Sequence, residues 1–235
     1  METITQSMLG MFLRCPHQFE RRYLRGEIIP PGIAARRGSA THEAAQINHE
    51  QKLQTQEDLP VADLTDAARD HYVRLITDEG VFIPKDQIAE KDTLLAKGRD
   101  AAIRLTELYR VSLAPAIQPL LVEEKMTMDA GLDLPLQGTI DVLTTDNWLP
   151  DLKTADKSKG PKEADYSLQL TFYARLVAHQ TGKWLEDWAN LLLRINLMLA
   201  QVQTGLFPPC DPSAWICSPQ WCGYFWTCTY SIKRI

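Results

Sequence analysis

The sequence predicts an α/β domain in which a mostly antiparallel or mixed central sheet is flanked by helices. Apolar residues recur at helical spacing over the first hundred residues, residues 120–154 change to short apolar stretches divided by turn residues, and a helical pattern returns near residue 164. With 235 residues, the chain can bury a sizeable core. We therefore expect a single domain over residues 1–235, with a helical region over 1–115, a sheet and helix over 116–182, and a carboxy-terminal region over 183–235.

Helices are expected throughout the amino-terminal region. One helical face is formed by residues at three- and four-residue steps, namely Phe12, Cys15, Phe19 and Tyr23. Pro16 can open a second helix at its first position, and Pro30-Pro31-Gly32 ends this unit. Apolar residues at helical spacing then predict helices over about 39–54, 63–78 and 93–112.

The sheet is expected in the middle of the chain. The apolar stretches 120–128, 136–144 and 148–154 are separated by Asp129-Ala130-Gly131 and by Asp146-Asn147, which are turn signals typical of an antiparallel meander. Further helices are predicted over about 164–180 and 184–203, and Thr204-Gly205 ends the second. The stretch 210–230 is rich in Cys, Trp, Pro and Tyr without a clear period, which is typical of a segment held by a metal or a cluster.

Composition and charge limit the classes of protein to consider. The chain is 45% hydrophobic and 23% charged, as in an ordinary soluble protein. We expect a cytoplasmic protein, because no signal segment is apparent and no window reaches the ~18 apolar residues of a membrane span. Five cysteines without a secretion signal favour metal or cluster ligation over disulfides.

The net charge of the chain is −5, but some segments carry a local excess of positive charge. Between Met11 and Gly38, six arginines face two glutamates, and lysines cluster after residue 151. Such groups either line a phosphate track or form ordinary solvated faces. The candidates for nucleic-acid contact are Arg21, Arg22, Arg36, Arg37, Lys157 and Lys159.

Two aspartates ten positions apart carry the main chemical signal. Asp141 ends the string Gly138-Thr139-Ile140-Asp141, and Asp151 begins Asp151-Leu152-Lys153. A hairpin would bring both carboxylates to one end of the sheet, where they and the Leu152 carbonyl suit a hard divalent cation such as Mg²⁺. Lys153 lies one pleat from Asp151 and can stabilise developing charge. Divalent cations at such sites serve phosphodiester hydrolysis, although surface turn residues give the same pattern.

A histidine adds to this pattern. Gly38-Ser39-Ala40-Thr41-His42 places an imidazole one turn into a predicted helix, and imidazole suits Mn²⁺-class metals beside carboxylates. Taken in order with Cys15-Pro16, Gln169-x3-Tyr173 and Cys-x4-Cys-Gly-Tyr-x3-Cys, these elements resemble the RecB-like nucleases of the PD-(D/E)XK superfamily. They are most similar to the iron-sulfur branch that includes CRISPR-associated RecB-like exonucleases and the nuclease domain of AddB-type subunits.

The resemblance spans about residues 7–228 and implies a restriction-endonuclease-like core with specific residue roles. His42, Asp141 and Asp151 would bind Mg²⁺ or Mn²⁺, and Lys153 would be the catalytic lysine. Gln169 and Tyr173, four residues apart on one helix face, would contact the active site or the DNA strand. Glu124 is a candidate auxiliary acid, with the adjacent Glu123 as an equal alternative.

The same resemblance implies a [4Fe-4S] cluster held by Cys15, Cys217, Cys222 and Cys228. Four thiolates are what this cluster requires, and it would clasp the first helix to the carboxy-terminal segment. Cys210 would then be the spare cysteine. Zinc is the competing occupant, because four thiolates also suit it.

The leading hypothesis is therefore a metal-dependent DNA exonuclease that acts on DNA ends, preferably single-stranded, in recombination, repair or phage DNA processing. No G-x4-G-K-[ST] motif is present, so if the protein resects long duplexes, another protein must unwind them. The alternative is a nucleic-acid-binding accessory subunit for a helicase, a recombinase, a single-strand annealing protein or a CRISPR adaptation complex. A weaker third hypothesis is a redox or zinc-binding interaction protein.

One departure from the family concerns the sheet. Family members usually carry a further strand with a basic turn after the Gln-x3-Tyr helix, but here Thr181-Gly182-Lys183 leads almost directly to Trp184. We expect this strand to be shortened or missing.

Overall fold

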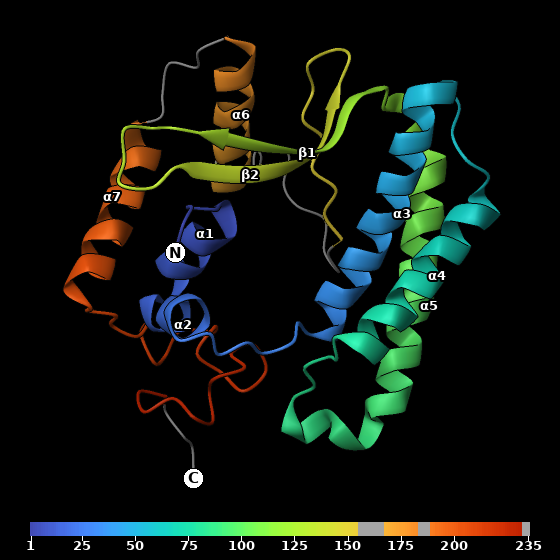
Figure 1. Ribbon diagram of the computed structural model, residues 1–235. Helices are drawn as coiled ribbons and strands as arrows, with labels where there is room; N and C mark the ends of the chain where they lie inside the picture. Colours follow the sequence, from blue (N-terminus) through green and yellow to red (C-terminus); the bar gives the residue numbers. More distant parts are fainter. Residues whose placement is uncertain (155–166, 183–188, 232–235) are drawn as a thin grey trace. The chain divides into compact units, whose positions relative to one another are not determined.

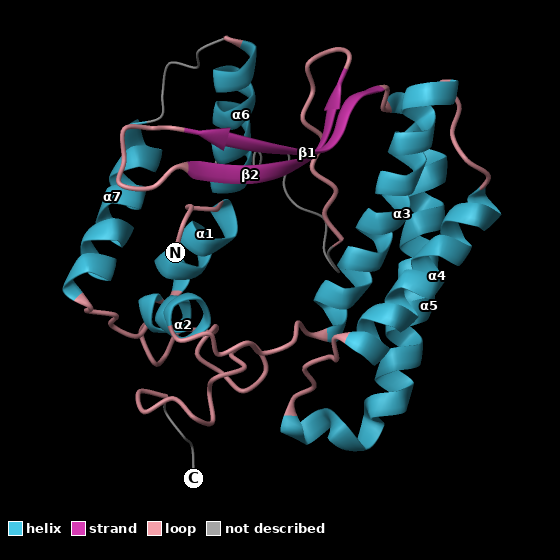
Figure 2. Ribbon diagram, in the orientation of Figure 1, coloured by secondary structure: helices cyan, strands magenta, loops and turns pink. Residues whose placement is uncertain are grey.

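The computed structural model describes residues 1–154, 167–182 and 189–231, with the side chains of the last range described from residue 195 (Figure 1). These residues form an α/β structure that is mostly helical and contains a small antiparallel sheet of two strands (Figure 2). They group into two compact units. Unit 1 comprises residues 1–29, 125–139 and 159–235, and unit 2 comprises residues 30–124 and 140–158.

Three long helices form the frame of unit 2. They are α3 (Ile33–Thr55), α4 (Val61–Asp78) and α5 (Lys91–Ser112), which all pack against one another. A short 3₁₀ turn, η2 (Lys85–Glu90), precedes α5, and another, η3 (Ala114–Ala116), follows it. Their shared core buries small and branched residues such as Ala44, Leu64 and Ala68, and the side chain of Leu152 packs against it. This contact fixes the chain next to Asp151.

Helices and the carboxy-terminal segment form most of unit 1. The elements are α1 (Gln6–Arg14), α2 (Pro16–Phe19), the π-helical turn η1 (Glu20–Leu24), α6 (Leu168–Thr181) and α7 (Ala189–Thr204). Thr5 caps α1 by accepting a hydrogen bond from the Met8 backbone N–H at 3.3 Å, and Ser167 caps α6 in the same way. Helix α1 packs against α6 and α7, and Leu9 and Phe172 are fully buried. Residues 205–231 contain turns but neither helix nor strand.

The sheet is a hairpin of β1 (Pro119–Met128) and β2 (Leu136–Thr144), and each strand contributes residues to both units. Ile4 adds an isolated parallel bridge to Leu136. Gly138 lets α6 approach β2 closely, because a Cβ atom there would lie 2.8 Å from Leu176 Cδ1 and 3.1 Å from Tyr173 Cε1. The glycine of the Gly-x-Ile-Asp string is therefore a packing position.

Most of the predicted elements are confirmed. The two predicted strands 120–128 and 136–144 match β1 and β2, and Pro16 opens α2 at its first position. The helices predicted over 39–54, 63–78, 93–112, 164–180 and 184–203 correspond to α3, α4, α5, α6 and α7, although residues 155–166 and 183–188 lie outside the described ranges.

The third predicted strand, 148–154, is wrong. This segment has no regular structure, because the Trp148 N–H donates to Thr144 Oγ1 at 2.9 Å and Pro150 has no N–H to offer a neighbouring strand. The larger central sheet that was expected is thus a single hairpin within the described residues. In these residues, no helix has the length and apolar character that crossing a lipid bilayer demands.

Candidate active site and cysteine cavity

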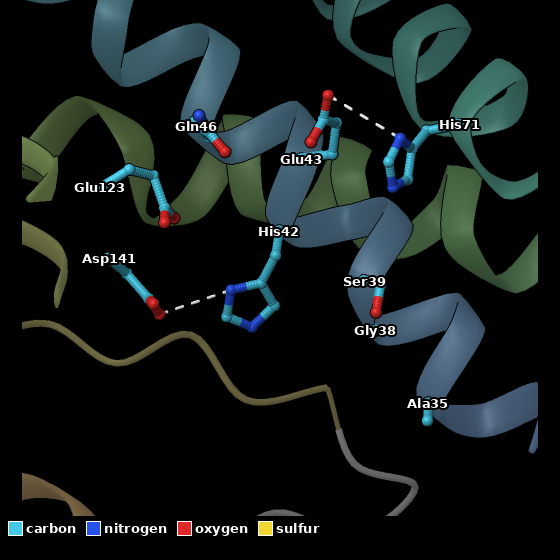
Figure 3. A pocket seen from close by; sticks show the side chains of 9 residues that line it. All are labelled: Ala35, Gly38, Ser39, His42, Glu43, Gln46, His71, Glu123 and Asp141. Atoms are coloured by element: carbon cyan, nitrogen blue, oxygen red, sulfur yellow. Dashed lines mark ion pairs between the residues drawn. The ribbon is translucent and has the colours of Figure 1, made fainter. Parts of the chain in front are cut away.

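A polar pocket of about 480 Å³ opens in unit 2, and we call it the acid-lined pocket. Helix α3 supplies one wall at helical spacing, α4 supplies a histidine, and each strand supplies one acid (Figure 3). The lining residues are Ala35, Gly38, Ser39, His42, Glu43, Gln46, His71, Glu123 and Asp141. Three carboxylates in one pocket create a strongly negative site that suits a cation.

His42 and Asp141 form the centre of this pocket. His42 Nδ1 lies 3.4 Å from Asp141 Oδ2, and the two side chains point toward each other from α3 and β2 (Figure 3). The Asp141 carboxylate raises the pKa of His42, burial lowers it, and a hydrogen bond to the Leu152 backbone raises it further. Two side chains predicted from separate strings of the sequence thus lie together with the Leu152 backbone.

Gly38 explains how the Leu152 segment reaches α3. A Cβ atom at Gly38 would lie only 2.8 Å from Thr154 Oγ1, so a larger residue would force the Thr154 side chain to shift. The glycine four residues before His42 is therefore a position of close approach, and it lies within α3.

Asp151 and Lys153 form the next part of the site. Lys153 Nζ donates to Asp151 Oδ1 at 2.7 Å, and the Asp151 side chain is only 12% exposed. The charge of Lys153 is close enough to lower the pKa of His42. Lys153 keeps 39% of its side chain exposed, so its ammonium group remains accessible to a ligand.

The pocket also contains a second His–carboxylate pair, formed between α3 and α4, that the sequence did not indicate. His71 Nδ1 lies 3.7 Å from Glu43 Oε1, and it also accepts a hydrogen bond from Arg74 Nη2 at 3.1 Å (Figure 3). Gln46 follows His42 by one helical turn, and this spacing indicates that both side chains lie on one face of α3. His71 comes from α4, which carries no motif, so no local signal pointed to it.

Glu123 lines the pocket, whereas Glu124 is not among the described lining residues. The Glu123 backbone has φ of 49° in the middle of β1, an uncommon conformation for a residue with a side chain. Burial, followed by the charge of Asp141, raises the pKa of Glu123. Of the two acids left open by the sequence, the pocket includes Glu123.

The other predicted site residues have different surroundings. Arg36, a candidate for nucleic-acid contact, is 4% exposed and donates to the Gly80 carbonyl oxygen and to Glu79. Arg21 pairs with Glu27, and the Arg22 guanidinium lies 5.7 Å from the centre of the Tyr23 ring. Arg37 is partly buried. Lys157 and Lys159 lie outside the described residues.

Gln169 and Tyr173 belong to unit 1, one turn apart on α6. This spacing puts both side chains on one helix face, as the sequence predicted. Their role as active-site or DNA contacts remains a prediction.

A second cavity, in unit 1, gathers all five cysteines, and we call it the cysteine cavity. It has a volume of about 20 Å³, and its sulfur-bearing lining is Cys15, Cys210, Cys217, Cys222 and Cys228. The Cys210 backbone N–H donates to Cys15 Sγ at 3.3 Å, and Gln18 Nε2 donates to Cys222 Sγ at 3.1 Å. All five cysteines are free thiols. The expected proximity of Cys15 to the carboxy-terminal cysteines is confirmed.

The thiols of this cavity influence one another. Burial, followed by the neighbouring Cys15 and Cys217, raises the pKa of Cys210 to about 12. Burial is also the largest cause of the raised pKa values of Cys217 and Cys222. Cys210, expected to be the spare cysteine, lies as close to this group as the others.

Both donor sets fit the groups that the sequence suggested. An imidazole, carboxylates and a backbone carbonyl suit Mg²⁺ or Mn²⁺, and four or five thiols around one small cavity suit an iron-sulfur cluster or zinc. Across the residues that the structure describes, no group of three or more His, Cys, Asp or Glu side chains is arranged closely enough to hold a metal ion.

An α/β fold with a His–Asp pair beside an Asp-x-Lys segment is typical of hydrolases that use a divalent cation. Comparison with protein families narrows this class. Residues 3–200 match the family model of the PD-(D/E)XK nuclease superfamily, which covers most of the chain. The chain belongs to the PD-(D/E)XK nuclease superfamily.

This match bears on the two sites differently. It includes His42, Asp141, Asp151 and Cys15, but it ends before the other four cysteines. No curated protein and no solved structure matches the chain. Superfamily membership supports a nucleic-acid substrate and a divalent metal.

Proposed function

We propose that this protein is a metal-dependent DNA exonuclease that hydrolyses phosphodiester bonds at DNA ends, with single-stranded ends preferred. The observation that carries the proposal is the position of His42 between the Asp141 carboxylate and the Leu152 backbone, with the Asp151–Lys153 pair directly adjoining in the chain. Superfamily membership supports the reaction class.

Each side chain has a specific role in this proposal. His42, Asp141, Asp151 and the Leu152 carbonyl would hold Mg²⁺ or Mn²⁺, which when bound activates water and neutralises phosphate charge. The Asp141 carboxylate orients the His42 ring, and the packing of the Leu152 side chain fixes the backbone beside it. Lys153 stabilises negative charge that develops on the phosphate oxygens. Glu123 is the proposed auxiliary acid in place of Glu124.

The first experiment measures cleavage of end-labelled single-stranded DNA in Mn²⁺. Asp151→Asn and Lys153→Ala should each lower the rate by about 10³-fold, the first because it removes a charged ligand of the proposed metal and the second because it removes the cation that stabilises negative charge in the transition state. Asp66→Asn is the matched control, since Asp66 is exposed on α4 and pairs with Arg69 outside the pocket. Wild-type rates in the Asp151 and Lys153 variants would contradict the proposal, and binding without cleavage by the wild type would favour the accessory-subunit alternative.

A second experiment separates exonuclease from endonuclease action. Linear and circular single-stranded DNA of the same sequence are incubated with the wild-type protein. An enzyme that requires ends should degrade the linear molecule and leave the circle intact. Equal cleavage of both would overturn the exonuclease part of the proposal while leaving the nuclease part in place.

We further propose that Cys15, Cys217, Cys222 and Cys228 hold a [4Fe-4S] cluster in the cysteine cavity. The support is the gathering of these thiols around one small cavity, together with the spacing of the cysteines in the sequence. Anaerobically purified protein should be brown and contain iron and sulfide. Cys222→Ser should lose the colour, whereas Cys210→Ser, the matched control, should keep it. A colourless protein with stoichiometric zinc would overturn the cluster assignment.

A further inference from the structure

The carboxy-terminal segment of unit 1 exposes its largest apolar side chains. Trp215 is 69% exposed, Trp221 is 56% exposed and Trp226 is 43% exposed. Tryptophan is normally well buried on average, and exposed aromatic groups of this size usually mark an interaction surface. Residues 205–231 therefore present a surface that the acid-lined pocket does not explain.

The fold of this segment causes the exposure. Short turns hold the chain, with the Cys217 N–H donating to the Ala214 carbonyl oxygen at 2.8 Å and the Cys222 N–H donating to that of Ser218 at 2.8 Å. These turns direct Ile216 and Phe225 inward, where both are buried. Trp215 and Trp226 lie next to these inward-facing residues in sequence and are themselves exposed, and Trp221 is exposed next to Cys222, which lines the cysteine cavity.

Two of the indoles form a pair, which we call the tryptophan pair. The ring centres of Trp215 and Trp221 lie 5.6 Å apart, and their planes are almost perpendicular at 86°. This edge-to-face contact limits the rotation of two exposed side chains. Because the contact is edge-to-face and both rings are more than half exposed, indole faces remain available for stacking.

Arginines of the amino-terminal helices contact the same carboxy-terminal segment, directly or through a neighbouring residue. Gln18, which contacts Cys222, accepts a hydrogen bond from Arg14 Nη2 at 3.1 Å. Further along, the Arg21 guanidinium lies 4.4 Å from the centre of the Tyr224 ring, with 12% of its side chain exposed. Arg14 and Arg21 thus connect the amino-terminal helices to the aromatic segment.

The charge balance of this region is positive. Residues 14–27 contain four arginines and two glutamates, and residues 205–231 contain one aspartate and no lysine or arginine. Glu20 and Glu27 pair with Arg25 and Arg21. Within the described part of the chain, neither Arg14 nor Arg22 forms an ion pair with a carboxylate. Such a surface suits a ligand that combines negative charge with flat aromatic groups.

We infer that the carboxy-terminal segment binds single-stranded DNA, with unpaired bases stacked on the tryptophan pair and phosphates attracted by the arginines of residues 14–27. Single strands expose base faces that a duplex hides, and stacking on aromatic side chains combined with contacts from cations is the usual way in which proteins hold them without sequence preference. The choice of DNA as ligand rests on the proposed function, whereas the surface itself is separate from the acid-lined pocket.

The test measures binding without cleavage. Every protein carries Asp151→Asn, and the affinity for a fluorescent thymidine oligomer is measured by anisotropy. Trp215→Leu and Trp221→Leu should each raise the dissociation constant by roughly fivefold or more, because each removes a stacking face. Trp215→Phe, which keeps an aromatic ring, should remain within about twofold of the parent. Leu206→Ala is the control, because Leu206 is 67% exposed in the same segment but cannot stack.

Two outcomes would overturn the inference. One is a dissociation constant for Trp215→Leu equal to that of the parent, as expected for an apolar protein-docking surface. The other is equal weakening by Leu and Phe, which would show that base stacking is not the cause of the loss. A retained melting temperature and circular dichroism spectrum show that each variant is folded.

A ligand change in the parent protein tests the same inference without depending on any variant. An abasic oligomer of the same length carries the phosphates without the bases. It should bind several-fold more weakly than the thymidine oligomer and should not quench tryptophan fluorescence. Equal binding of both oligomers would also overturn the inference. These experiments measure DNA binding and not cleavage. A protein that binds DNA through the tryptophan pair but does not cleave it would contradict only the nuclease proposal.

Discussion

The acid-lined pocket takes all its residues from two long helices and two strands, whereas the cysteine cavity takes most of its residues from a segment without helix or strand. Backbone hydrogen bonds and a shared core hold the first arrangement in place. Turns, and contacts such as the one from Gln18 to Cys222, hold the second. A site built on regular elements keeps its shape when one ligand is removed, but a site built on turns depends on its cross-links.

The largest effect expected from this comparison concerns the activity of the pocket. Asp141→Asn keeps the shape of the side chain but removes its charge, so cleavage should fall by about 10³-fold or more. The melting temperature should change little, because Asp141 is partly exposed and its ion pair with His42 contributes only about 1 kcal/mol. Nuclease assays and thermal unfolding of the same sample check both expectations. A large loss of stability would mean that the pair supports the fold of unit 2.

The cysteine cavity should respond in the opposite way. In the proposed cluster, Cys222→Ser removes a cross-link between Cys15 and the carboxy-terminal segment, and closing a loop of roughly 200 residues contributes on the order of 5 kcal/mol. The free energy of unfolding should fall by about this amount, and proteolysis should become fast within residues 205–231. Limited proteolysis followed by mass spectrometry locates the cuts. An unchanged proteolysis pattern would show that turns alone hold the segment.

These two regions also differ in how far the sequence predicts them. The helices over 63–78 and 93–112 and the two strands could be predicted because each carries a regular apolar period. The predicted start of helix α3, at Ser39, lies six residues after its observed start at Ile33. Gly38 looks like a flexible break in the sequence, but it lies within the helix because it allows Thr154 to approach. Sequence alone cannot separate a glycine that breaks a helix from one that permits a contact.

The candidate site was predictable in the same selective way. His42, Asp141 and Asp151 stand out because their residue types and spacing match a metal-dependent reaction. His71 does not, since its place beside Glu43 depends on how α4 packs on α3. Arg36 looked like a surface cation, but the loop after α4 buries it against Gly80. Packing between helices determines these positions, and a single sequence does not encode it as a local pattern.

A buried polar network makes the stability of unit 2 sensitive to pH. Tyr109 Oη donates to His49 Nε2 at 2.7 Å, and Asn48 Nδ2 donates to Asp58 Oδ1 at 2.7 Å. Burial lowers the pKa of His49 to about 4. Between about pH 6.5 and pH 4, His49 is therefore protonated in the unfolded chain but neutral in the folded chain. As the pH is lowered through this window, the free energy of unfolding should fall by up to about 3 kcal/mol.

Denaturant unfolding at pH 7.5, 5.5 and 4.5 checks this expectation, with His49→Phe as the comparison. The phenyl ring keeps much of the volume but cannot take up a proton, so the variant should show a weaker dependence on pH below 6.5. The carboxylates titrate equally in both proteins, so the difference between the two curves of unfolding free energy against pH isolates the contribution of His49. Parallel curves would show that His49 is not the titrating group.

The smallest expected effect is on the free energy of unfolding when a helix glycine in each unit is replaced by alanine. Gly98 lies where α5 meets α4, and a Cβ atom there would lie 2.3 Å from Tyr72 Oη and 2.6 Å from Ile33 Cγ2. Gly10 lies in α1 of unit 1, where the nearest atom would be Gln6 Nε2 at 3.5 Å, an ordinary contact. Gly98→Ala should therefore destabilise unit 2 by about 1–3 kcal/mol.

Gly10→Ala is the matched control for that change, because it adds the same methyl group to a helix. It should stabilise the protein by about 0.5–1 kcal/mol through the higher helix propensity of alanine. Equilibrium denaturation of both variants measures the difference in sign. If Gly98→Ala were stabilising as well, the close contact between α4 and α5 would have room to relax, and the rigid frame assigned to the acid-lined pocket would be looser than its packing indicates.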